Sequence, residues 1–116
     1  MVSVLVRSMD RDTLHEALAS VAAQTAEGVN QGGGALTRPQ ACNAAIDTAH
    51  GQWLIFLDDD DTIEPDHLQR LLHALATFEG ARVAYTGVRV TDAAGQTLRT
   101  TDEHFDRVRL WQANFL

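Results

Sequence analysis

The sequence predicts an α/β fold with three layers, in which helices cover both faces of a mainly parallel sheet. Two short apolar segments, Val2 to Val6 and Trp53 to Leu57, have the composition of buried strands. Helical apolar spacing follows each of them, and strands that alternate with helices favour parallel pairing through right-handed crossovers. The length of 116 residues suits one core, so we expect residues 1–116 to form a single domain.

The region before Trp53 predicts two helices and a connector. After the first predicted strand, four apolar residues recur at helical spacing: Leu14, Leu18, Val21 and Ala22. From Ala26 to Leu36 the periodicity is lost, and the glycine run Gly32 to Gly34 predicts a flexible connector. Pro39 suits the first turn of a second helix, which Gly51 ends.

The segment Trp53 to Leu57 and the four aspartates after it, Asp58 to Asp61, are the most informative stretch of the chain. Five consecutive large apolar residues predict a strand in the middle of the sheet, buried on both faces. Adjacent carboxylates repel one another, and ligands of open α/β sheets bind at the carboxyl ends of strands. Magnesium and manganese take carboxylate oxygens, so the pattern favours a divalent metal site that holds a phosphorylated ligand. The alternative is that the aspartates only solvate a turn and cap the next helix.

The remainder of the chain predicts a helix, a hairpin and an apolar end. Pro65 opens the helix, whose apolar stripe consists of Leu68, Leu71, Leu72, Leu75 and Phe78. Arg82 to Thr91 and Thr97 to Thr101 read as two strands around a turn. The end, Phe105 to Leu116, is apolar at intervals. Two apolar surfaces, the tail Trp111 to Leu116 and the sheet edge left where a further strand is missing after the first helix, are expected to drive association into a homodimer or larger homo-oligomer.

Composition excludes several classes of protein. The net charge is −7 and no basic stripe offsets phosphate charge, so we expect no nucleic-acid partner. Cys42 is the only cysteine, which rules out an intrachain disulfide and is compatible with a reducing compartment. The first residues lack the basic leader and apolar length of a signal peptide, and a cytoplasmic location is therefore expected.

Four segments carry a recognisable pattern: Val2 to Arg11, Leu14 to Thr25, Asn43 to Gly51 and Trp53 to Pro65. The most specific of them has the pattern Phe-Leu-Asp-x-Asp-Asp-x-x-x-Pro, and Ser-Val-x-x-Gln-Thr ends the first predicted helix. Together these segments resemble family 2 glycosyltransferases, enzymes with the GT-A fold. The resemblance extends to about Leu75 and implies a nucleotide-diphospho-sugar-binding domain over residues 1–116.

The resemblance also implies roles for individual residues. Asp58 and Asp60 occupy the Asp-x-Asp positions that bind Mg²⁺ or Mn²⁺, and Asp59 lies beside them, near the ribose of the sugar donor or the metal. Arg7 and Met9 fall where the family contacts the base, and Arg38 falls near the diphosphate. The implied reaction transfers a sugar from a nucleotide diphosphate to an acceptor, which the sequence does not identify. Metal and arginine would stabilise the charge that develops on the leaving nucleoside diphosphate.

Two departures from the family pattern lead us to expect a truncated GT-A domain. The family has a second strand after the Gln-Thr ending, and here Ala26 to Gly34 stands in its place. The acceptor-side motif that supplies the family's catalytic base is also missing, so the catalytic base is unknown. Asp102, Glu103 and Asp106 are the remaining acidic candidates, and this chain alone is expected to be inactive in transfer.

Two alternative functions stay open. Asp58 to Thr62 also fits Asp-x-Asp-x-Thr, the signature of haloacid-dehalogenase-like phosphatases, in which Asp58 would be the nucleophile and Asp60 the acid and base. Those enzymes usually begin with that strand and use a later lysine, whereas this strand lies mid-chain and lysine is absent. The second alternative is a catalytically incomplete module that only binds a nucleotide sugar.

Overall fold

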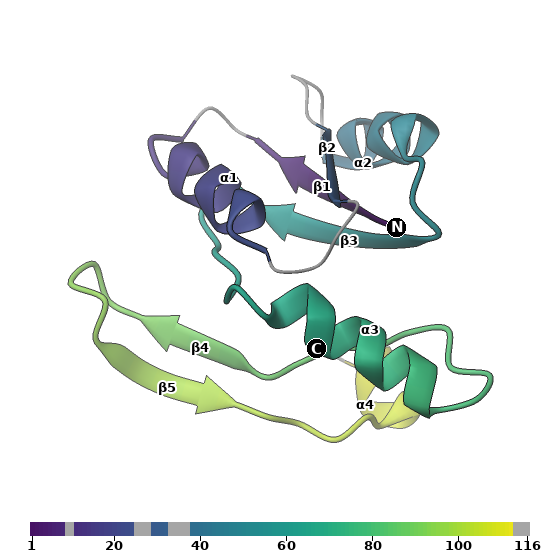
Figure 1. Cartoon of the computed structure of the whole chain (residues 1–116). Helices are drawn as coiled ribbons and strands as arrows, with labels where there is room; N and C mark the ends of the chain where they lie inside the picture. The colour runs from purple at the N-terminus through teal and green to yellow at the C-terminus, as the bar shows by residue number, and fades with distance from the viewer. Residues whose placement is uncertain (9–10, 25–28, 33–37, 113–116) are drawn as a thin grey trace. The chain divides into compact units, whose positions relative to one another are not determined.

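A computed structural model describes residues 1–8, 11–24, 29–32 and 38–112 of the chain. Helices and strands alternate along it up to a final hairpin and short helix, as expected for an α/β protein (Figure 1). The chain divides into two compact units, Met1–His73 and Ala74–Leu116. None of the described helices has both the length and the apolar composition that crossing a membrane requires.

The first unit contains a parallel three-stranded sheet with the order β2-β1-β3. Its strands are β1 (Val2–Arg7), β2 (Val29–Gly32) and β3 (Trp53–Asp58). The register pairs Val2 with Val29 of β2 and with Trp53 of β3. The predicted α/β class with a parallel sheet is therefore confirmed.

The strand β2 corrects the prediction that Ala26 to Gly34 replaces the family's second strand. Residues 29–32 run parallel to β1, with Ser3 opposite Asn30 and Leu5 opposite Gly32. Pairing uses backbone groups, which Asn30, Gln31 and Gly32 possess as fully as apolar residues do. The segment was missed because its polar composition carries no apolar periodicity, which is the signal that identifies strands in a sequence.

The second correction concerns the position of β3. We expected it in the middle of the sheet with both faces buried, but among the described strands β1 is central and β3 pairs only with β1. Accordingly, Val2 to Val6 are all buried, whereas Leu54 and Phe56 of β3 are each 43% exposed. An unbroken apolar run does not distinguish a central strand from an edge strand with one covered face.

Helix α1 (Leu14–Ala22) and the start of α3 (His67–Thr77) share the main apolar core with the sheet. The alternate side chains of β1 that face this core are Val2, Val4 and Val6. They cluster with Ala17, Val21, Leu57 and Leu68. Burial of this cluster is what holds the carboxyl ends of β1 and β3 in a fixed relation to α1.

Helix α2 (Arg38–Thr48) is connected to β1 through Ser3. The hydroxyl of this buried serine accepts hydrogen bonds from the backbone N–H groups of His50 (3.2 Å) and Gly51 (2.8 Å), directly after the helix. Gly51 lies so close to β1 that a Cβ atom there would come within 2.8 Å of the Val2 carbonyl carbon. The glycine therefore allows the close approach of this turn to the sheet, whereas α2 already ends at Thr48, three residues before the predicted end at Gly51.

The second unit contains an antiparallel hairpin of β4 (Val88–Thr91) and β5 (Thr97–Thr101), followed by the short helix α4 (Arg107–Gln112). The predicted hairpin is confirmed, although its first strand begins at Val88 rather than Arg82. Asp92 fixes the turn, because its carboxylate accepts hydrogen bonds from the backbone N–H groups of Ala94 (2.9 Å) and Gln96 (2.8 Å).

Candidate metal and sugar-donor site

The carboxyl ends of β1 and β3 bring an arginine and an aspartate together. In the parallel register Arg7 lies opposite Asp58, and the Arg7 guanidinium donates a hydrogen bond to the Asp58 carboxylate. Burial lowers the pKa of Arg7, but the charge and hydrogen bond of Asp58, with a further hydrogen bond to Cys42, outweigh burial and raise that pKa. Arg7 is therefore held as a cation beside the first aspartate of the run.

Three carboxylates gather in the turn that follows β3. Asp58, Asp60 and Asp61 each offer an oxygen, and these oxygens lie within 4.8 Å of one another. The backbone N–H of Asp61 donates to the carbonyl of Asp58 (3.1 Å), which closes the turn and brings the side chains to one place. Partial burial raises the pKa of Asp61, and the nearby charges of Asp60 and Asp58 raise it further.

The chemistry of this cluster fits a hard divalent cation. Carboxylate oxygens are the ligands that Mg²⁺ and Mn²⁺ prefer, and a cation would relieve the repulsion that raises the pKa of Asp61. Asp58 and Asp60, the two predicted ligands, both belong to the cluster. Asp61 was not predicted as a ligand, although the run of four aspartates already contained the signal.

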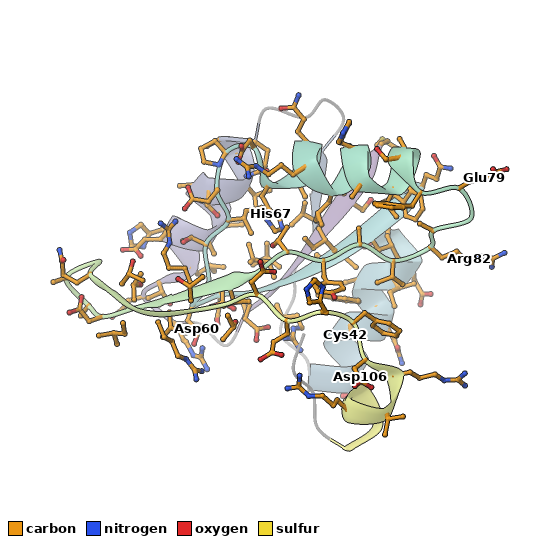
Figure 2. All side chains as sticks on the ribbon, turned by 90° about the horizontal axis from the view of Figure 1, so that it is seen from below. Cys42, Asp60, His67, Glu79, Arg82 and Asp106 are labelled. Atoms are coloured by element: carbon orange, nitrogen blue, oxygen red, sulfur yellow. The ribbon has the colours of Figure 1, made fainter. Side chains whose placement is uncertain are left out.

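Asp59 lies outside that cluster. Its side chain is only 2% exposed and its Oδ1 atom is 3.4 Å from Nη1 of Arg11. The same Arg11 nitrogen is also paired with the carboxylate of Asp60, which is labelled in Figure 2. Arg11 is thus a residue of the site that sequence reasoning missed, even though it ends the first segment that resembles the family.

A set of hydrogen bonds from α1 fixes the chain after the acidic turn. The hydroxyl of Ser20 accepts from the backbone N–H of Ile63 (3.3 Å). The side-chain amide of Gln24 donates to the carbonyl of Glu64 (2.9 Å) and accepts from the backbone N–H of Leu68 (3.1 Å). These contacts give a structural reason for the serine and glutamine of the Ser-Val-x-x-Gln-Thr ending.

Met9 and Arg38 are the two other residues predicted to contact the sugar donor. Met9 lies outside the described residues, and Arg38 opens α2 but its side chain is not among those described. The structure therefore brings together Arg7, Asp58 and Asp60 of the predicted site.

The acidic candidates for a catalytic base lie in the second unit, and two of them have structural partners. Glu103 accepts a hydrogen bond from Arg109 (2.7 Å). Asp106, at the start of α4 in Figure 2, accepts from the backbone N–H groups of Val108 (2.8 Å) and Arg109 (3.1 Å), as an N-cap does. Asp102 is exposed.

Comparisons with known proteins agree with the resemblance. The chain is similar to the succinoglycan biosynthesis protein ExoO of Rhizobium meliloti (strain 1021), with 40% identity over 63 residues. That similarity covers 54% of this chain and 18% of the relative, so the matched part is less than a fifth of that protein. The family model of glycosyl transferase family 2 matches residues 36–115, a stretch that includes the acidic turn and begins after β1 and β2. Because this match covers more than half of the sequence, the chain belongs to glycosyl transferase family 2.

Proposed function

We propose that this chain binds a nucleotide-diphosphate sugar through a divalent metal and serves its transfer to an acceptor. The observation that carries the proposal is the cluster of Asp58, Asp60 and Asp61, whose oxygens lie within 4.8 Å of one another at the carboxyl end of β3. Family membership supports glycosyl transfer over the phosphatase alternative for the same aspartates. The similarity to a protein of succinoglycan biosynthesis favours a glycan as the acceptor.

The described residues have distinct parts in this proposal. Asp58, Asp60 and Asp61 would hold Mg²⁺ or Mn²⁺, which when bound neutralises the diphosphate of the sugar donor and of the leaving group. Arg7, held at the same strand ends, is proposed to contact the nucleotide, as Met9 is. Arg38 is proposed to contact the diphosphate and Asp59 to lie near the ribose or the metal. We place these residues on a GT-A domain with three layers.

Asp60→Asn tests the metal assignment. We expect this variant to lose affinity for Mn²⁺ and for a nucleoside diphosphate together, because the ion bridges carboxylates and phosphates. Isothermal titration with Mn²⁺, and then with UDP or GDP in the presence of Mn²⁺, measures both affinities.

Asp47→Asn is the matched control, since it removes the same charge from an exposed position near the end of α2. Its affinities should equal those of the unmodified chain. Unchanged nucleotide affinity of Asp60→Asn in the presence of Mn²⁺ would contradict the assignment.

A further inference from the structure

Two arginines form ion pairs with carboxylates of the proposed metal cluster. Arg7 is paired with Asp58, and Arg11 is paired with Asp60. A divalent cation bound at the cluster would use oxygens of these same carboxylates as ligands. A guanidinium and a metal ion repel each other, so they compete for the charge of one carboxylate. Binding of a cation at the cluster therefore weakens these arginine contacts.

The surroundings of the two arginines indicate which one moves. Arg7 belongs to β1, lies opposite Asp58 in the sheet register, and its side chain is 25% exposed. Arg11 lies beyond the strand, its side chain is 41% exposed, and its partner Asp60 is 49% exposed. Replacing the Arg11–Asp60 contact by solvent or another anion requires less rearrangement, because both groups already reach water.

Asp59 supplies a second reason to choose Arg11. This carboxylate is almost fully buried, and Nη1 of Arg11 is 3.4 Å from it. A buried carboxylate needs a compensating charge, so the contact with Asp59 keeps Arg11 at the site when the contact with Asp60 is lost. Asp59 acts as the anchor of the arginine, and Asp60 is the partner that it can exchange.

We propose that Arg11 is an exchangeable counter-ion of the metal cluster. In the absence of metal it neutralises Asp60, and when a divalent cation binds it leaves Asp60, stays anchored on Asp59 and becomes available to the diphosphate that the cation holds. The inference rests on the proposed function and adds Arg11 to it as a residue that positions the diphosphate. It predicts that Arg11 opposes binding of the metal alone and favours binding of the metal together with a nucleoside diphosphate.

The test measures Mn²⁺ binding to the whole chain by the electron paramagnetic resonance signal of free Mn²⁺, first without nucleotide. Arg11→Gln should bind Mn²⁺ several-fold more tightly than the unmodified chain, because no cation competes for Asp60. Addition of UDP or GDP should strengthen Mn²⁺ binding less in Arg11→Gln than in the unmodified chain. Arg70→Gln is the control, since Arg70 of α3 pairs with Asp66, directly before the helix, at an exposed position, and the substitution should change neither quantity.

Arg11→Gln leaves the buried Asp59 without this cation and could fail to fold for that reason. The double variant Arg11→Gln with Asp59→Asn removes both charges, and circular dichroism checks that each variant is folded. A folded Arg11→Gln variant with the Mn²⁺ affinity of the unmodified chain, or a folded double variant with the Mn²⁺ affinity of Asp59→Asn alone, would overturn the role of Arg11. Absence of Mn²⁺ binding in every variant would instead overturn the proposed function, and this inference with it.

Discussion

The side-chain oxygen of Gln24, at the end of α1, accepts a hydrogen bond of 3.1 Å from the backbone N–H of Leu68, the second residue of α3. The first N–H groups of a helix have no partner within the helix, and a side chain of the preceding turn usually satisfies one of them. Here the capping side chain belongs to Gln24, which lies 44 positions earlier in the sequence. The amide of Gln24 also donates to the carbonyl of Glu64. One side chain therefore joins α1 to the segment between the acidic turn and α3.

Gln24→Ala should lower the free energy of unfolding by about 1–2 kcal/mol, the usual cost of removing a helix cap and leaving backbone groups without a partner. Urea denaturation of the unmodified chain and the variant measures this difference. Gln52→Ala is a matched control, because Gln52 is exposed and no described contact uses its side chain. Equal destabilisation by the two substitutions would contradict the role of Gln24.

Stability of the metal-free chain should depend on pH through Asp61. Its pKa is raised above the ordinary value of 3.8 by partial burial, Asp60 and Asp58, while Arg11 and Arg7 oppose the shift. The folded chain therefore holds this proton to higher pH than the unfolded chain does. As pH rises from 3.8 through the folded pKa, ionisation of Asp61 removes stability.

Asp61→Asn should thus be more stable than the unmodified chain at neutral pH without metal, and the two should converge below the ordinary pKa. The gain should not exceed about 1 kcal/mol, because solvent screens the repulsion among these exposed carboxylates. Urea denaturation across this pH range, with a chelator present, checks it. Saturating Mn²⁺ should cancel or reverse the gain, since the ion neutralises the repulsion. A variant less stable at neutral pH in the chelator would contradict the prediction.

The sequence predicted those parts of the fold that carry strong local signals. Apolar composition identified β1 and β3, and the aspartate run identified the place where the acidic cluster forms. The pairing of the strands could not be deduced from the sequence. The polar strand β2 joins the sheet through its backbone groups, and β3 pairs with β1 while Phe56 stays half exposed. The predicted association into a homo-oligomer is untested. One of its two stated causes is wrong, because β2 pairs with the edge of β1 where a strand was expected to be missing.

The residues of the acidic cluster were predicted to a similar extent. The family pattern singled out Asp58 and Asp60, whose role as metal ligands stays a prediction. It did not reveal the contact of Arg11 with two aspartates, because Arg11 and the aspartates are about 50 positions apart in the chain. A pattern along the sequence shows which residues are present, whereas side-chain pairs depend on the register of β1 and β3. For the same reason the burial of Asp59 among three exposed or half-buried neighbours could not be foreseen.

This chain should bind the sugar nucleotide and hydrolyse it slowly at most, without transfer to an added acceptor. Transfer needs a base within hydrogen-bond reach of the acceptor hydroxyl, and correct positioning provides much of the rate enhancement. Glu103 already pairs with Arg109, and Asp106 already caps α4. A carboxylate held in this way is poorly placed to accept a proton, which leaves Asp102 among the three candidates.

Incubation with Mn²⁺, radiolabelled nucleotide sugars and simple glycan acceptors measures both reactions, because free sugar and glycosylated acceptor separate by chromatography. We expect only free sugar, in an amount that Asp60→Asn abolishes. Labelled acceptor that also depends on Asp60 would contradict the prediction. Asp102→Asn would then decide whether Asp102 is the base. Glu103→Gln is the comparison, because this substitution removes an ion pair with Arg109 and leaves Asp102 in place.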